Sequence, residues 1–289
     1  MMRNKIIFYN VIILVILLFV VEVVFRIFGF GLQNAPLEND SYLHHKNPSN
    51  YNFTCYALDG EYGGHDIYFD SIGRRIDEAQ KKRANNKRSN NKKVWFLGDS
   101  FTAAFQVKWK DSFVGILDSL SEYKAENYGV SSYSPLLYYL QLKLYLSNKV
   151  KPEKVFIQLY SNDIAGDKMY SKYTSFINDV PVACVGEDPQ HILRLLRKSY
   201  IVRVLRKTQL TIQYLFSREE ELRVNDHVEP VAIIDPESYF CRNILLIKEL
   251  LESYGIEYYF FAIPSKYASV SGNWDSANFA INTNEFFRN

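Results

Sequence analysis

The sequence has few cysteines and little net charge, and each shortage excludes a class of protein. Its three cysteines, Cys55, Cys184 and Cys241, stand far apart and form no C-x-x-C pair, so their spacing indicates neither a disulfide framework nor a zinc site. One pair could still bridge in an oxidising compartment. The 34 basic residues nearly balance the 32 acidic ones, for a net charge of +2, which excludes a strongly basic nucleic-acid-binding protein.

Apolar sequence is abundant, and the first 32 residues are the most apolar. With 47% hydrophobic residues in 289, the chain can bury a sizeable core, so we expect one main soluble domain with additional segments. The run from Ile6 to Phe25 is interrupted only by Tyr9, Asn10 and Glu22. As a helix it would be about 30 Å long, the thickness of the hydrocarbon core of a bilayer. This length predicts a membrane anchor at residues 1–32.

A cleaved signal peptide is the alternative interpretation of this segment. Its apolar region would be shorter and would end in small residues, whereas this one continues into "VEVVFRIFGFG", so we favour an uncleaved anchor. Arg3 and Lys5 precede the span, while Arg26 beyond it is partly offset by Glu22. The positive-inside rule then predicts a cytoplasmic N-terminus, a single pass through the cell membrane and an extracytoplasmic soluble domain. Glu22 lies near the end of the span, where its carboxylate can reach the membrane–water interface at little energetic cost. We therefore do not expect an intramembrane functional carboxylate.

Residues 33–92 are rich in Asn, Gly, Tyr and charge, and we expect a stalk and an irregular lead-in there. The stretch "QKKRANNKRSNNKK" at its end holds seven basic residues in fourteen, which predicts a solvated, mobile loop. A nucleic-acid-binding patch is the alternative, but no aromatic residues are interleaved for base stacking. We therefore expect no nucleic-acid partner.

From Lys93 onward, strand patterns alternate with helix patterns. Strands are expected at 93–100, 123–130, 153–164 and 256–265, and helices at 111–120, 134–148 and 237–255. This alternation predicts an α/β fold: a three-layer α/β/α sandwich with a mostly parallel sheet. Ligands bind such sheets at the carboxyl ends of the strands, which selects the rim of one site: Gly98 to Ser100, Asn127 to Ser132, Tyr160 to Asp163, and Pro264 to Ser265.

Three groups at these strand ends suit acyl transfer. Ser100 offers a hydroxyl, Gly129 a backbone N–H that a substrate can approach closely, and Asn162 a neutral amide donor. A hydroxyl nucleophile with preorganised donors around it can stabilise a tetrahedral oxyanion. Taken singly, Gly-Asp-Ser could simply form a turn and Asn162 an Asx turn. Their succession at three consecutive strand ends is more specific.

These motifs resemble those of the SGNH (GDSL-like) hydrolase superfamily, especially its membrane-anchored bacterial members. "GDSFT" at 98–102 is similar to the first block, "NYGVSSYSP" at 127–135 to the second and "YSNDI" at 160–164 to the third. The resemblance implies a catalytic Ser100, an oxyanion hole of Ser100, Gly129 and Asn162, and no cofactor or metal. It covers roughly residues 66–266, starting near "DSIGRR" at 70–75, which is similar to a lead-in common in this superfamily. Tyr160 and Ser132 stand where the superfamily usually has glycine.

The fourth block of the superfamily, an Asp-x-x-His that supplies the base and the residue orienting it, has no match. Nothing after "FFAIPS" fits it, and no histidine follows His227. Without a base, a serine hydroxyl is a poor nucleophile at neutral pH. We therefore expect the hydrolase domain, 93–289, to be incomplete at its C-terminus.

The five histidines offer no clear replacement base. Four are expected to be exposed loop residues: His44, His45, His65 and His227. The fifth belongs to the one literal Asp-x-x-His, "DPQH" at 188–191. There Asp188 followed by Pro189 is a typical helix start, so capping explains the motif without catalysis.

The helix expected after His191 is basic and amphipathic. One face is apolar and much of the remainder is basic, with Arg194, Arg197, Lys198, Arg203, Arg206 and Lys207. Such a helix could lie on an anionic membrane surface, or it could be a domain helix with an ordinary solvated face, which we favour. It belongs to an insertion at about 165–235, where a lid over the site would influence substrate choice.

Two functional hypotheses follow. The chain is either a membrane-anchored extracytoplasmic serine esterase or O-acyltransferase acting on acyl (acetyl) esters of cell-surface glycans, or a truncated or catalytically deficient relative acting as a binding or scaffold module. Its expected partners are the membrane and an acyl-ester or glycan substrate.

Overall fold

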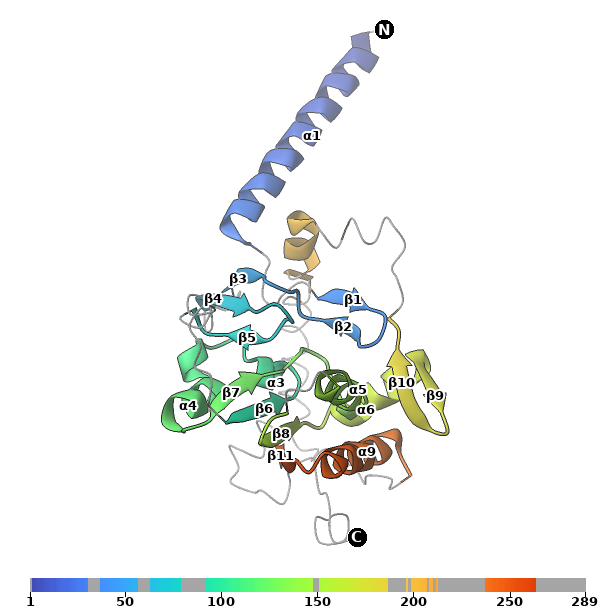
Figure 1. Ribbon diagram of the computed structural model, residues 1–289. Coiled ribbons are helices and arrows are strands. Elements are labelled where there is room, and N and C mark those ends of the chain that lie inside the picture. The colour runs from blue at the N-terminus through green and yellow to red at the C-terminus, as the bar shows by residue number, and fades with distance from the viewer. Residues whose placement is uncertain are drawn as a thin grey trace, which may run out of the picture. The chain divides into compact units, whose positions relative to one another are not determined.

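The computed structural model (Figure 1) divides the chain into two compact units. The structure describes residues 2–30, 37–56, 63–78, 92–147, 151–186, 196, 199–206, 208–209, 212 and 237–263. The first unit comprises Met1–Asn34, Phe53–His65 and Asp188–His227, and the second comprises Ala35–Asn52, Asp66–Glu187 and Val228–Asn289. Residues 80–91 of the basic stretch lie outside the described residues. The predicted domain ranges stay a prediction.

The first unit begins with one long helix, α1 (Met2–Phe28). Its Lys5–Phe28 segment is long and apolar enough to cross a membrane, and its most apolar window is not buried against other parts of the protein. The apolar N-terminal helix expected from the sequence is therefore present.

The main sheet runs in the order β11-β8-β6-β7-β5-β4-β3. The strands are β3 (Asn52–Tyr56), β4 (Gly63–Phe69), β5 (Arg75–Ile76), β6 (Lys93–Leu97), β7 (Lys124–Asn127), β8 (Lys154–Leu159) and β11 (Glu257–Ala262). The pairs β11–β8, β8–β6 and β6–β7 are parallel, whereas β7–β5 and β5–β4 are antiparallel. The expected strands after Lys93 are confirmed, and the fold is mixed α/β with a parallel central part.

Helices cover both faces of this sheet in the second unit (Figure 1). They are α3 (Ser100–Ala103), α4 (Phe113–Leu120), α5 (Pro135–Leu146), α6 (Asp163–Tyr170) and α9 (Tyr239–Ser253), with 3₁₀ turns η1 (Trp109–Asp111) and η2 (Ser171–Tyr173). On one face, Val114 of α4 packs with Val94 and Phe96 of β6. On the other, α5 and α9 pack over the alternate residues Trp95 and Leu97. The period of two along β6 thus supplies a core on each side.

The expectation of an irregular lead-in at residues 33–92 is wrong. Besides β3, β4 and β5, this region holds the antiparallel pair β1 (Glu38–Asp40) and β2 (His44–Lys46). The strand signal is present but short: Phe53 and Cys55 are buried on β3, and Ile67 and Phe69 on β4. Two apolar residues per strand are too few to stand out from the surrounding polar sequence. A second hairpin, β9 (Thr174–Ile177) with β10 (Val180–Cys184), lies within the predicted insertion.

The "DSIGRR" segment forms a turn that ends at the buried Arg75. The Asp70 carboxylate accepts from the N–H groups of Ile72 and Arg74, and Gly73 adopts φ +83°. A Cβ on Gly73 would lie 2.6 Å from the Asn47 carbonyl oxygen, so glycine is required both for the dihedral angle and for the space.

Arg75 then reaches the segment after α3. Its Nη1 donates to the carbonyls of Ala103 and Ala104, and its Nη2 donates to the Val107 carbonyl at 2.7 Å. Because all three acceptors are backbone groups, the Arg75 side chain fixes the backbone that follows Ser100.

Replacing Arg75 by methionine should destabilise the second unit by about 2–4 kcal/mol, because the three carbonyls lose a charged donor. Thermal unfolding of the detergent-solubilised chain, followed by circular dichroism, measures the loss. Arg242→Met, at an exposed position of α9, is the matched control and should change stability by no more than about 0.5 kcal/mol. Equal effects of the two changes would contradict the role given to Arg75.

Candidate active site

Ser100 is the first residue of α3, at the carboxyl end of β6. The preceding turn is tight, because a Cβ on Gly98 would lie 2.1 Å from Thr102 Oγ1 and 2.6 Å from Gln158 Oε1. Asp99 caps the helix, its Oδ1 accepting from the Phe101 N–H at 2.9 Å. Ser100 is half-exposed, and among the described residues its hydroxyl has no hydrogen-bond partner. The predicted nucleophile is thus accessible.

Asn162 lies at the carboxyl end of the neighbouring strand, β8, just before α6. Its side chain is exposed and does not cap α6. The turn is closed by Asp163 instead, whose Oδ2 accepts from the Tyr160 N–H at 3.0 Å. The Asn162 amide is therefore not used in the local turn, contrary to the alternative that it forms an Asx turn.

The strand ends that carry Ser100 and Asn162 lie side by side. Strands β6 and β8 pair in parallel, with Leu97 opposite Ile157. Beyond them, the Phe101 and Tyr160 rings contact each other, with centroids 4.7 Å apart. Phe101 is 43% exposed. An accessible aromatic pair thus borders both predicted site residues.

Gly129 packs against the backbone of α3, but its N–H is already paired. An added Cβ would lie 2.4 Å from the Ala103 nitrogen. The Gly129 N–H donates to Asn127 Oδ1 at 2.8 Å, and its carbonyl accepts from Asn47 Nδ2 at 3.1 Å. While the Asn127 bond is made, this N–H does not donate to a substrate oxyanion. The oxyanion role of Gly129 stays a prediction. The glycine is needed for close packing.

The loop after Gly129 is held by aromatic and histidine side chains that the sequence did not reveal as partners. Ser132 adopts φ +67°, a left-handed conformation that costs a non-glycine residue roughly 1–2 kcal/mol. The Tyr170 hydroxyl donates to the Ser132 carbonyl at 2.8 Å, and His45 Nε2 lies 2.9 Å from the Ser131 carbonyl. These contacts keep the loop in its conformation despite the strain.

The expectation that His44 and His45 are exposed loop residues is wrong. Both lie in β2, and His45 is only 7% exposed. Burial lowers the pKa of His45 to about 4, so the ring is neutral at pH 7. Because the Ser131 carbonyl can only accept, the His45 proton is on Nε2, and its Nδ1 accepts from His44 Nδ1 at 2.9 Å. Both ring nitrogens of His45 are thus used in structural hydrogen bonds.

Three further histidines are the remaining candidates for a base. The side chain of His65, together with His191, His227 and Asp188, lies outside the described residues. The described residues also contain no group of three or more His, Cys, Asp or Glu side chains arranged to hold a metal ion.

Two buried carboxyl groups, Asp99 and Asp163, are sequence neighbours of the predicted site residues, and a third, Asp167, lies one turn further along α6. Burial raises the pKa of Asp163 to about 9, and the nearby Asp99 and Asp167 carboxyls add to the shift. Burial also raises the pKa values of Asp99 and of Asp167, the latter to about 6. Asp167 joins two helices, accepting from the Leu136 N–H of α5 and from Asn243 Nδ2 of α9. Asp163 is therefore an uncharged acid at neutral pH, next to Asn162.

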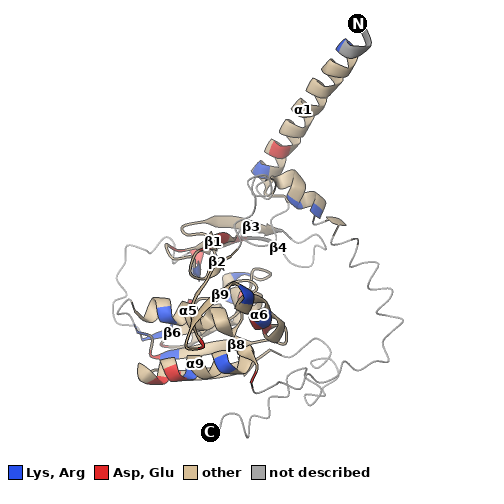
Figure 2. Cartoon of the chain, turned by 90° about the vertical axis from the view of Figure 1, so that its right-hand side faces the viewer, with Lys and Arg blue, Asp and Glu red and all other residues tan. Residues whose placement is uncertain are grey.

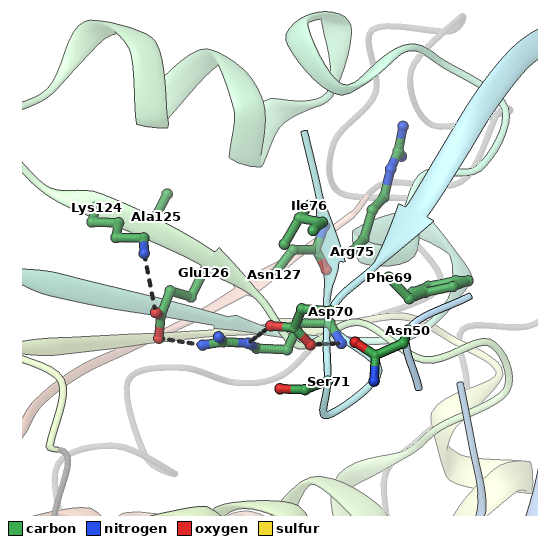
Figure 3. A pocket seen from close by; sticks show the side chains of 11 residues that line it. Asn50, Phe69, Asp70, Ser71, Arg75, Ile76, Lys124, Ala125, Glu126 and Asn127 are labelled. Carbon is green, nitrogen blue, oxygen red and sulfur yellow. Dashed lines mark hydrogen bonds and ion pairs between the residues drawn. The ribbon is translucent and has the colours of Figure 1, made fainter. Parts of the chain in front are cut away.

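A cavity of about 390 Å³ lies elsewhere, along β5 and β7 (Figure 3). Charged side chains pair with one another at its wall: Arg74 bridges Asp70 and Glu126 at 2.7 Å each, and Lys124 lies 4.0 Å from Glu126. Neither Ser100 nor Asn162 lines it. The cavity is therefore separate from the candidate active site.

No protein-family model matches the sequence, and no curated protein matches it. Among solved structures, the chain is similar to a protein described as lipolytic and of the G-D-S-L family from Desulfitobacterium hafniense DCB-2, with 16% identity and a TM-score of 0.26, covering 59% of this chain and 77% of that one. It is also similar to a point mutant of the esterase AlinE4, with 14% identity and a TM-score of 0.28, covering 66% of this chain and 97% of that one. TM-scores this low do not establish a shared fold or activity.

Replacing Asp163 by asparagine should flatten the pH dependence of stability. An acid whose pKa rises from 3.8 to about 9 on folding binds a proton only in the folded state between those values, so stability falls as the pH rises through that window. The substitution should reduce the slope by up to ~1.4 kcal/mol per pH unit. Thermal unfolding across this window tests the prediction, with the exposed Asp111→Asn as control. An unchanged slope in Asp163→Asn would show that Asp163 ionises normally.

Replacing Gly129 by alanine should destabilise the protein by about 1–3 kcal/mol, because the new methyl group would overlap the backbone of α3. Unfolding measurements compare it with Gly166→Ala, where the methyl group would lie 3.0 Å from Ser134 Cβ and the helix would gain propensity. A loss no larger for Gly129→Ala than for Gly166→Ala would refute the packing role.

Proposed function

We propose that this chain is an SGNH-type serine esterase or O-acyltransferase with a three-layer α/β/α domain. In this proposal Ser100 Oγ attacks the acyl carbon of an ester while Asn162 donates to the oxyanion, and the ester alcohol leaves carrying the serine proton. Water or a sugar hydroxyl then takes the acyl group from the serine, and its proton restores the Ser100 hydroxyl. The observation that carries the proposal is the pairing of Phe101 with Tyr160 at 4.7 Å, since it places the strand ends bearing Ser100 and Asn162 together.

The environment of Ser100 favours nucleophilic attack in two respects. Ser100 is the first residue of α3, which Asp99 caps, so the helix backbone fixes the position of Ser100. The neighbouring Asp163 is protonated at neutral pH because burial raises its pKa, and an uncharged acid does not repel a developing oxyanion as a carboxylate would.

We further propose that α1 spans the cell membrane once, with a cytoplasmic N-terminus and the second unit outside. The length and composition of α1 and the positions of Arg3 and Lys5 support this arrangement. An extracytoplasmic location favours acylated, in particular acetylated, cell-surface glycans as substrates. The accessible rings of Phe101 and Tyr160 are suited to contact a sugar face.

The second candidate function is a catalytically deficient SGNH-like protein that acts as a binding or scaffold module. The specific observation in its favour is the position of His45, whose ring bonds the Ser131 carbonyl and His44. In this case the site would bind an acyl ester without turning it over.

Substituting Ser100 by alanine distinguishes the two candidates. If Ser100 is the nucleophile, hydrolysis of a small acyl ester by the detergent-solubilised chain should fall about a thousandfold or more, without a change in melting temperature. Ser119→Ala, which removes an exposed hydroxyl of α4, is the matched control and should keep full activity. Equal rates for the unaltered chain and Ser100→Ala would eliminate the serine-esterase proposal and leave the binding role.

A further inference from the structure

Glu22 of α1 caps a second helix of the first unit, formed by residues 200–206. Its Oε1 accepts from the Tyr200 N–H, and its Oε2 accepts from the Ile201 N–H, both at 3.0 Å. The Ser199 hydroxyl also donates to Oε2 at 2.9 Å. Amides in the first turn of a helix lack intrahelical partners, and a carboxylate there also offsets the helix dipole. These three hydrogen bonds thus join the capped helix to α1.

Two arginines complete the junction between these helices. Arg26, one turn beyond Glu22, donates from Nε to Oε1 at 2.8 Å. Its guanidinium lies 5.1 Å from the centre of the Tyr200 ring, and that of Arg203 lies 4.9 Å from the same ring. Figure 2 shows acidic and basic residues on α1 near the end away from the N-terminus, whereas the long middle of the helix is uncharged. The junction therefore lies where an apolar span would meet the lipid headgroups.

The capped helix also exposes apolar side chains next to basic ones. Leu205 is 64% exposed, and Arg206 beside it is exposed as well. Leu196 and Ile212, which are also helical, are exposed too. Apolar side chains beside arginines, at the end of a membrane-spanning helix, are suited to the lipid–water interface.

We propose that the helix at 200–206 lies in the headgroup layer of an anionic leaflet, with Leu205 against the acyl chains and Arg206 beside lipid phosphates. The occupant of this surface is the membrane that α1 spans, since Glu22 fixes the helix at the end of that span. Arg26 is paired with Glu22, so the exposed Arg206 supplies the charge that complements an anionic lipid surface. The proposal depends on α1 spanning the membrane, and it does not depend on the activity of Ser100.

The test places an environment-sensitive fluorophore on Leu205→Cys in the full chain, reconstituted in phosphatidylcholine vesicles with or without phosphatidylglycerol. Quenching by nitroxide-labelled lipid reports immersion. Leu14→Cys in α1 is the immersed control, and Leu120→Cys, at an 80% exposed position of α4, is the aqueous control. The native cysteines are buried and are common to all variants.

The label at position 205 should be quenched in vesicles containing phosphatidylglycerol, and less so without it, whereas the label at 120 should not be quenched. Water-like emission at 205, or equal quenching in both lipids, would overturn the proposal. Absence of quenching at position 14 would also overturn the proposal, because it would show that α1 is not inserted in the membrane.

Arg206→Gln tests the role of charge. Removing one basic residue from an anionic surface should lower the ratio of docked to undocked helix about fivefold, seen as weaker quenching at position 205. Arg242→Gln, in α9, removes an exposed arginine outside this helix and should leave the quenching unchanged. Equal quenching in the two variants would contradict the phosphate contact.

Discussion

Helix α3 has only four residues, so most of its carbonyl groups must find partners outside the helix. The Thr102 carbonyl accepts from Asn127 Nδ2 at 2.7 Å, and the Ala103 carbonyl accepts from Arg75 at 2.8 Å. Gly129 lets β7 and its following loop approach the same backbone. Ser100 is held in place by these contacts, which come from two separate segments of the chain. The geometry of the candidate nucleophile therefore depends on residues that never touch a substrate.

The sequence predicted the parts of the fold that carry a long periodic signal. The strands and helices after Lys93 stand out because their apolar residues recur with a clear period, and their order implied the α/β class. The strands before residue 77 were missed because β3 and β4 each bury two apolar side chains, while β1, β2 and β5 bury none. Boundary errors are small: the pattern at 153–164 ran through the end of β8 into α6, which begins at Asp163.

The site was predictable in its residues and less so in its bonding. Ser100 and Asn162 follow from their positions at strand ends, since parallel strands bring their carboxyl ends to one edge. That the Gly129 N–H is paired with Asn127, and that His45 is buried against the Ser131 carbonyl, depends on contacts between segments far apart in the sequence. Such pairings are set by tertiary packing and leave no local pattern. The raised pKa of Asp163 likewise comes from burial, which its sequence neighbours do not reveal.

The cap that Glu22 provides also orders events during synthesis of the chain. Glu22 and its partners at 199–201 are 177 to 179 residues apart. At translation rates of about 5–20 residues per second, the ribosome needs about 10 to 35 s to add that length. In that interval the carboxylate has Arg26, one turn away, as a partner at 2.8 Å. The Glu22–Arg26 ion pair within α1 can thus form before the capped helix is synthesised. It balances the charge of Glu22 until residues 199–201 are made and complete the junction.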